Sequence, residues 1–94
     1  MSKRINENFL EELFSTIKQR DKSKRINSYT KNLLKQGKNK IAQKIAEESS
    51  ELIYDYLNGS KKRVIKETSD LLYHMIILLY SKKISITEIE KELK

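Results

Sequence analysis

The sequence predicts an all-α fold, a helical hairpin within a bundle of four to five helices, as a single domain over residues 1–94. Three observations lead to this prediction. Apolar residues recur at the spacing of a helix face along most of the chain. Proline is absent. No segment shows the strict alternation of a half-buried strand, and there are no repeats or low-complexity tracts.

The first predicted helix covers residues 6–20, with Asn6 or Asn8 as its cap. Its apolar side chains follow the i, i+3, i+4, i+7 pattern: Leu10, Leu13, Phe14 and Ile17. A polar, basic connection over residues 21–27 leads into a short helical turn that ends near Gly37.

Two longer helices are predicted over residues 39–58 and 60–81, separated by a break at Gly59. Ser60 is the predicted N-cap of the second. Because the connection is short, the two helices should lie antiparallel as a hairpin. A last short helix is expected over residues 85–93. Local signals therefore place every element of the bundle.

The segment Leu71–Tyr80 is apolar almost throughout. It is too short to span a bilayer, which requires about 20 residues. A helix that is apolar all round is buried on every side. In so small a chain this predicts a homodimer, with a second subunit covering Leu72, Ile76 and Leu79.

The net charge of +7 is unevenly placed. The first 40 residues hold 11 lysines and arginines against 4 acids, whereas the remaining residues hold 9 of each. This asymmetry predicts an anionic partner near the first half, although solvated lysines would also explain it. Without cysteine, disulfides and thiolate metal sites are excluded. No apolar signal segment follows the start, so a cytoplasmic location is expected.

Acidic residues recur three apart on the two long helices, as Glu48 with Glu51 and Glu67 with Asp70. Residues at this spacing share one helix face. Facing each other across a hairpin, four carboxylates would form an oxygen-rich site suited to Mg²⁺ or Mn²⁺. Such pairs also occur on solvated helix faces, so the spacing alone leaves both interpretations open.

The composition excludes some of the common ways of binding a phosphate group. With only two glycines, the chain cannot build a glycine-rich phosphate loop. A carboxylate-held metal ion with nearby cations is suited to phosphoanhydride chemistry. Lys44 lies one turn before Glu48, where it could face a phosphate or simply form an i, i+4 ion pair. His74, the only histidine, is expected to be an ordinary histidine bonded to Asp70.

These residues resemble a known superfamily, the all-α nucleotide pyrophosphatases, which includes MazG-type enzymes and all-α dUTPases. Within it, residues 9–93 are most similar to the phosphoribosyl-ATP pyrophosphatases. The residues that carry the resemblance are Leu13 to Arg20, Ser28-Tyr29-Thr30, Gly37, Lys44 to Glu48, Glu51, Glu67, and Asp70-Leu71-Leu72-Tyr73-His74. Lys66 departs from the pattern, because relatives often carry an acid there.

The resemblance implies Mg²⁺-dependent hydrolysis of phosphoribosyl-ATP, a nucleotide related to ATP, to phosphoribosyl-AMP and pyrophosphate in the second step of histidine biosynthesis. It implies a homodimer in the stand-alone form, without the cyclohydrolase domain to which the family is often fused. No nucleic-acid or membrane partner is expected.

The resemblance also implies roles for individual residues. Glu48 is both catalytic and a metal ligand, and Glu47 acts beside it by orienting water or supporting the ion. The expected metal ligands are Glu48, Glu51, Glu67 and Asp70. The expected contacts to substrate phosphates are Arg20, Ser28, Tyr29, Thr30 and Lys44. Each has an ordinary structural alternative: Arg20 suits a helix C-terminus, and Ser28 or Thr30 suits an N-cap.

Two other functions stay open. A house-cleaning nucleoside triphosphate pyrophosphatase, dUTPase-like or MazG-like, would share the acids, but the Ser28-Tyr29-Thr30 segment argues against it. A basic helical module that binds nucleic acid would explain the charge. It would leave four acids beside the apolar stripe without a purpose.

Overall fold

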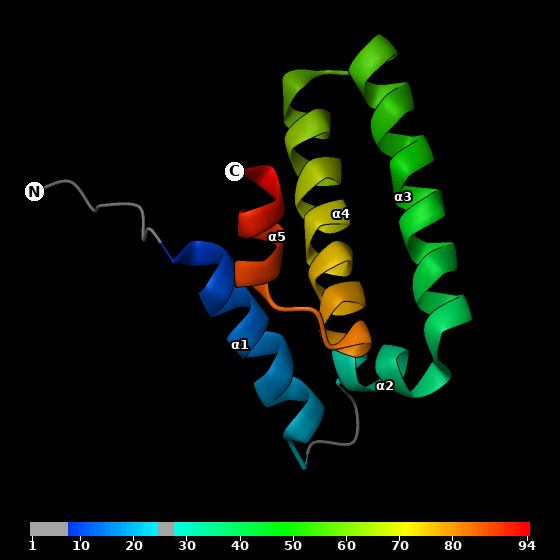
Figure 1. Ribbon diagram of the computed structural model, residues 1–94. Helices are drawn as coiled ribbons and strands as arrows, with labels where there is room; N and C mark the ends of the chain where they lie inside the picture. Colours follow the sequence, from blue (N-terminus) through cyan, green and yellow to red (C-terminus); the bar gives the residue numbers. More distant parts are fainter. Residues whose placement is uncertain (1–7, 25–27) are drawn as a thin grey trace, which may run out of the picture.

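The computed structural model describes residues 8–24 and 28–94, and these form an all-α bundle without any strand (Figure 1). The predicted fold class is confirmed. The helices are α1 (Phe9–Lys22), α2 (Tyr29–Gln36), α3 (Lys38–Asn58), α4 (Lys61–Lys82) and α5 (Ile86–Leu93).

The helix ends largely follow the predicted signals. Asn8 occupies the N-cap position of α1, whereas Asn6 lies outside the described residues. The expected short turn before Gly37 is a full helix, α2, whose cap is Ser28. Gly37 alone joins α2 to α3, with a φ of 96° that favours glycine over residues with a side chain.

Helices α3 and α4 form the predicted antiparallel hairpin (Figure 1). Ser60 caps α4 by accepting a hydrogen bond from the Arg63 backbone N–H. Gly59 is needed at the turn because a Cβ there would lie 2.9 Å from Oδ1 and 3.0 Å from the carbonyl oxygen of Asp55. The turn is therefore fixed by the close approach of Asp55 as well as by the cap.

All five helices contribute to one core at the base of the hairpin. We call the base the end of the hairpin where Ile41 of α3 and Ile77 of α4 meet α1, α2 and α5. The buried core residues are Ile17, Leu33, Ile41, Ile76, Ile77 and Ile86. The opposite end, residues 53–65, has no covering helix, and we call it the tip (Figure 1).

The apolar segment of α4 is covered differently from the prediction. Ile76, expected to face a second subunit, is 3% exposed because the chain's own core surrounds it. Leu72 and Leu79 are half-buried within the same chain. The argument for a dimer from Ile76 is therefore wrong, although dimerisation itself remains a prediction. Within the described residues, none of the helices combines the length and apolar character that crossing a membrane requires.

Candidate functional site

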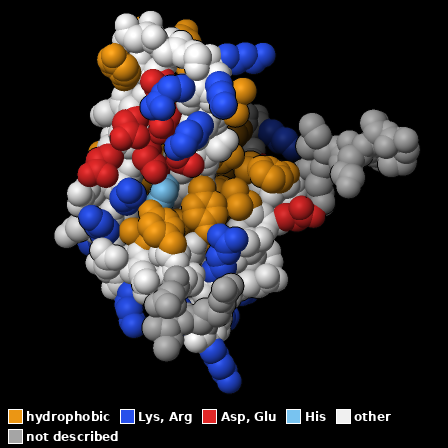
Figure 2. Space-filling model, turned by 180° about the vertical axis from the view of Figure 1, so that it is seen from behind, with side chains coloured by type: hydrophobic (Ala, Val, Ile, Leu, Met, Phe, Trp, Pro, Cys, Tyr) orange, Lys and Arg blue, Asp and Glu red, His pale blue; other side chains and the backbone are white. Residues whose placement is uncertain are grey.

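The acidic side chains gather on one face of the α3–α4 hairpin, bordered by lysine and arginine side chains (Figure 2). Glu48 lies in the middle of α3, and its side chain is 12% exposed. Glu67 on α4 is more enclosed, with a side chain that is 6% exposed. Asp70 is more open, at 43%. The hairpin thus brings acids from both helices to one face and removes two of them from water.

Glu51 and Glu67 interact directly across the hairpin. Burial raises the pKa of the Glu67 carboxyl, and a hydrogen bond with Glu51 and repulsion from its charge raise it further. Two neighbouring carboxylates hold a proton more readily than one, because both cannot ionise without mutual repulsion. A cation at this point would remove that repulsion.

Two basic side chains stand among these acids. Lys66 Nζ lies 3.0 Å from Asp70 Oδ2 and 4.0 Å from Glu67 Oε2. A terminal nitrogen of Arg63 lies 3.8 Å from Glu67 Oε2. The Lys66 ammonium therefore pairs with two predicted metal ligands.

The predicted ligand set is therefore only partly assembled. Over residues 8–24 and 28–94, no three acids or histidines converge in a group that could hold a metal ion. Glu48 nonetheless fits the role. Its Oε1 is buried and accepts no hydrogen bond, a costly state for a carboxylate unless an ion or donor compensates it. Carboxylate oxygens are also the donors that Mg²⁺ and Mn²⁺ prefer.

His74 links this acid to α2. Its Nδ1 lies 2.9 Å from the backbone oxygen of Asp70 and 2.7 Å from Glu48 Oε1. The contact with Glu48 is close without hydrogen-bond geometry, since Oε1 has no hydrogen-bond partner. The Nε2 lies 2.6 Å from the Tyr29 hydroxyl. The expected bond to Asp70 is present, but through the backbone.

The segment Ser28-Tyr29-Thr30 takes three different positions. Ser28 Oγ accepts a hydrogen bond from the Lys31 backbone N–H and so caps α2, the structural alternative considered for it. Thr30 is 1% exposed, which leaves it no surface for a ligand. Tyr29 is 51% exposed on the face that carries His74. Of the three, Tyr29 is placed to meet a substrate.

Each predicted cation lies near one tyrosine, Arg20 near Tyr73 and Lys44 near Tyr29. Arg20 donates a hydrogen bond of 2.6 Å from a terminal nitrogen to the Tyr73 hydroxyl. Lys44 is near enough to Tyr29 that its charge opposes the rise in the pKa of the Tyr29 hydroxyl, which burial causes and Glu48 strengthens. In the described part of the chain, Lys44 makes no ion pair with Glu48. Glu47 is exposed and accepts a 3.0 Å hydrogen bond from Gln43 Nε2.

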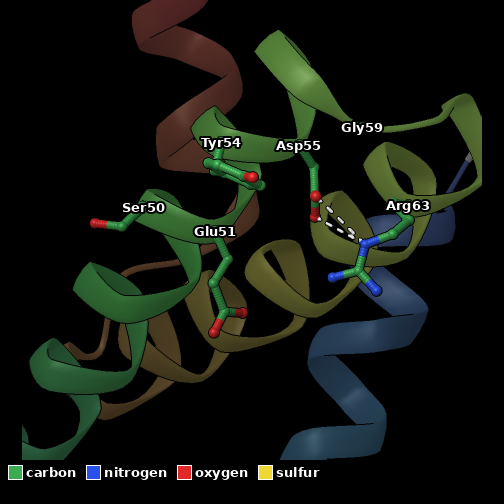
Figure 3. A pocket seen from close by; sticks show the side chains of 6 residues that line it. All are labelled: Ser50, Glu51, Tyr54, Asp55, Gly59 and Arg63. Carbon is green, nitrogen blue, oxygen red and sulfur yellow. Dashed lines mark hydrogen bonds and ion pairs between the residues drawn. The ribbon is translucent and has the colours of Figure 1, made fainter.

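A cavity of about 500 Å³ adjoins the acids at the turn of the hairpin. Arg63 reaches across this turn to Asp55 (Figure 3), with Nε 3.3 Å from Oδ1. The cavity is lined by Ser50, Glu51, Tyr54, Asp55, Gly59 and Arg63. Sequence reasoning assigned nothing to Asp55, which is 4% exposed. The signal available was an acid followed eight residues later by an arginine across a predicted turn.

Tyr73 was also left without a role. It lay inside the Asp70-to-His74 motif, but the sequence could not show that its hydroxyl lies 2.5 Å from Thr30 Oγ1. A partly buried tyrosine hydroxyl requires a polar partner. That requirement was the only available signal, and it names no partner.

Comparison with known proteins gives a consistent result. The family model described as phosphoribosyl-ATP pyrophosphohydrolase matches residues 10–94. The phosphoribosyl-ATP pyrophosphatase of Bacillus cytotoxicus is 44% identical over 94% of this chain and 82% of its own length. That of Sulfolobus acidocaldarius is 38% identical over 96% and 95%. The histidine biosynthesis bifunctional protein HisIE of Bacteroides thetaiotaomicron is 43% identical over 92% of this chain and 42% of its own length.

Proposed function

Since the chain belongs to the phosphoribosyl-ATP pyrophosphohydrolase family, we propose that the acidic face of the α3–α4 hairpin is its active site and holds Mg²⁺. The chain hydrolyses phosphoribosyl-ATP to phosphoribosyl-AMP and pyrophosphate, a step of histidine biosynthesis. The requirement for Mg²⁺, the residues of the site, the dimer and a cytoplasmic location are parts of this proposal.

The observation that carries the proposal is the buried Glu48 Oε1 without a hydrogen bond. It lies beside the α4 face on which burial and repulsion from Glu51 raise the pKa of Glu67. Both features are unfavourable in the isolated chain, and a divalent cation would relieve both. Glu48, Glu51, Glu67 and Asp70 are the residues that would hold it, with Lys66 moving away from Asp70.

A bound Mg²⁺ would neutralise phosphate charge and stabilise the charge that develops in the transition state. The chain's own residues do the rest. Arg20 beside Tyr73 and Lys44 near Tyr29 offer positive charge where the polyphosphate would lie. Glu47 is exposed next to Glu48 and is our candidate to orient the attacking water.

The function is tested by supplying phosphoribosyl-ATP with Mg²⁺ and measuring released pyrophosphate. We expect release that stops when the cation is chelated and resumes when it is restored. ATP and dUTP at the same concentration are the controls for a general nucleotide pyrophosphatase. Equal release from dUTP would favour the house-cleaning alternative.

Metal binding also has a test without substrate. A ligand that binds only the folded state adds about 2.7 kcal/mol to the free energy of unfolding when its concentration is 100 times its dissociation constant. The thermal midpoint should therefore rise with Mg²⁺ beyond an NaCl control of equal ionic strength. A thermal midpoint that stays unchanged up to roughly tens of millimolar Mg²⁺ would contradict the proposed site.

A homodimer is supported by the apolar surface of the hairpin. The tip exposes more than half of each of several large apolar side chains: Ile53, Tyr54, Tyr56, Leu57 and Ile65. Met75 and Ile89 help line a second, apolar groove of about 400 Å³. Large apolar side chains left exposed in this number are typical of protein interfaces. Sedimentation at micromolar concentration should give about twice the 11.1 kDa chain mass, and a monomer would contradict it.

A further inference from the structure

Two adjacent residues of α4, Tyr73 and His74, connect the parts of the site that come from different helices. His74 contacts α3 through Glu48 and α2 through Tyr29. Tyr73 contacts α2 through Thr30 and α1 through Arg20. Neither has a role in the proposed function, yet between them they touch residues of every helix that contributes to it.

The His74 ring is fixed on all sides. It is 6% exposed. The rings of Tyr29 and Tyr73 stand nearly perpendicular to it, with centroids 5.6 and 5.9 Å away. The Asp70 carbonyl oxygen, 2.9 Å from Nδ1, can only accept a hydrogen bond, so Nδ1 carries a proton. In the neutral ring Nε2 then accepts the hydrogen bond from the Tyr29 hydroxyl.

This arrangement places a positively polarised N–H beside one particular oxygen of Glu48. The N–H of Nδ1 is directed at the Asp70 carbonyl, yet Glu48 Oε1 lies only 2.7 Å away. The contact places Oε1 against the ring and leaves it without a hydrogen bond. A carboxylate held in this way keeps one orientation and remains able to bind a cation.

Tyr73 acts on the other side of the site. Its oxygen accepts the hydrogen bond from Arg20, whose guanidinium carbon lies 5.9 Å from the centre of the ring. The hydroxyl of Tyr73 is also anchored to Thr30, which is buried and cannot follow a ligand. Arg20 is therefore restrained although it is exposed.

We propose that His74 and Tyr73 are positioning residues with separate tasks: His74 orients Glu48 toward the divalent cation, and Tyr73 orients Arg20 toward the substrate phosphates. The inference rests on the proposed function and deepens it. It separates the contribution of α4 to metal binding from its contribution to substrate binding, although the two residues are neighbours.

The first experiment measures metal affinity without substrate, by titrating Mn²⁺ and following the electron paramagnetic resonance signal of the free ion. In His74→Asn the amide nitrogen replaces Nδ1, whereas in His74→Gln it reaches the place of Nε2. Loss of a partner that orients a metal ligand costs about 10–100-fold in metal affinity. We expect that loss in His74→Gln, with most of the affinity recovered in His74→Asn.

The second experiment measures pyrophosphate release at saturating Mg²⁺. Tyr73→Phe should raise KM for phosphoribosyl-ATP about tenfold or more, as expected when a charge-assisted phosphate contact is weakened, and should leave the Mn²⁺ dissociation constant unchanged. Tyr80→Phe is the matched control, because it removes the hydrogen bond from Tyr80 to Asp21, which lies outside the site. It should change neither quantity.

The inference is overturned if His74→Asn and His74→Gln bind Mn²⁺ equally well, or if Tyr73→Phe weakens Mn²⁺ binding as much as His74→Gln. Circular dichroism melts check that the variants fold. If neither His74 variant folds, Tyr29→Phe decides, because it removes the donor to Nε2 from an exposed residue. Unchanged Mn²⁺ affinity in Tyr29→Phe then overturns the role of His74.

Failure of the proposed function has a different signature. A wild-type chain that binds Mn²⁺ but releases no pyrophosphate from phosphoribosyl-ATP would refute the activity. The Mn²⁺ titrations would still test whether His74 orients Glu48. A wild-type chain that binds no Mn²⁺ would refute the metal site, and the task assigned to His74 would be refuted with it.

Discussion

The base and the tip of the α3–α4 hairpin are built from the same two helices but differ in what surrounds them. At the base, Ile41 and Ile77 are almost fully buried among α1, α2 and α5. At the tip, Ile53 and Leu57 remain more than half exposed, and the Asp55–Arg63 pair closes the turn. Apolar residues of similar size thus have opposite environments about three to four helical turns apart, since one turn holds about 3.6 residues.

The difference shows where stability and function separate in this molecule. Burying a large aliphatic side chain contributes about 1.5–3 kcal/mol, so the base holds the fold together. The acidic face lies between base and tip, with Glu48 enclosed and Asp70 open. A charged site at this boundary can be supported by the base without disturbing its packing.

The largest expected effect is on stability, from truncation at the base. Ile77→Ala should destabilise the fold by about 2–5 kcal/mol, because the side chain is fully buried and the cavity cannot collapse completely. Urea unfolding of the wild type and the variant measures it. A loss below about 1 kcal/mol would mean that the base does not dominate stability.

The second prediction is that replacing Asp70 lowers turnover and leaves the stability of the fold nearly unchanged. Asp70→Asn keeps the shape of the side chain and removes one charge from the proposed metal site. Losing one preorganised electrostatic contact costs about 10²–10³ in turnover, whereas the exposed pair with Lys66 stabilises the fold by about 0–1 kcal/mol.

Pyrophosphate release and a thermal melt of the same preparation test this prediction. Glu90→Gln on α5 is the control, because it removes an acid from an exposed position on a different helix. Near-normal turnover in Asp70→Asn would remove Asp70 from the site. A collapse of the metal-free fold would make Asp70 structural.

The third prediction is the counterpart of the first at the tip. Leu57→Ala, truncating a side chain that is 69% exposed, should change the stability of the monomer by no more than about 0.5 kcal/mol. Urea unfolding at concentrations where the chain is monomeric measures it. A loss as large as that of Ile77→Ala would erase the distinction between the two ends. A weakened dimer at higher concentration would instead support the tip as the interface.

The smallest expected effect concerns α5, the most exposed part of the base. Hydrogen bonds from the Ser85 backbone and side chain lower the pKa of Glu88 in the folded chain. A carboxyl with a lowered folded pKa stabilises the fold above its unfolded pKa, and this contribution is lost as pH falls through the folded pKa. Glu88→Gln should therefore melt slightly below the wild type at pH 7.

The gap between Glu88→Gln and the wild type should close as the pH falls below 4.5, the ordinary value for this group. Melts of both proteins across this range test the sign. A gap that widens toward acid pH would contradict the capping role of Glu88.

Much of the fold could be predicted because its signals are local. Helix spacing, the cap Ser60 and the stop at Gly59 each depend on residues within one or two turns. The two acid pairs belong to the same class, since their spacing on one helix face follows from the sequence. These features, the fold class and the family resemblance were determined by the sequence itself.

Other features depend on residues far apart in the chain, and only the tertiary structure decided them. Ile76 was expected to face a second subunit, but the chain's own core covers it. His74 meets Glu48 and Tyr29, and Tyr73 meets Arg20, 53 residues away. Helix periodicity fixes which face of a helix a side chain occupies. It does not fix which helix packs against that face, because this depends on how all five helices share one small core.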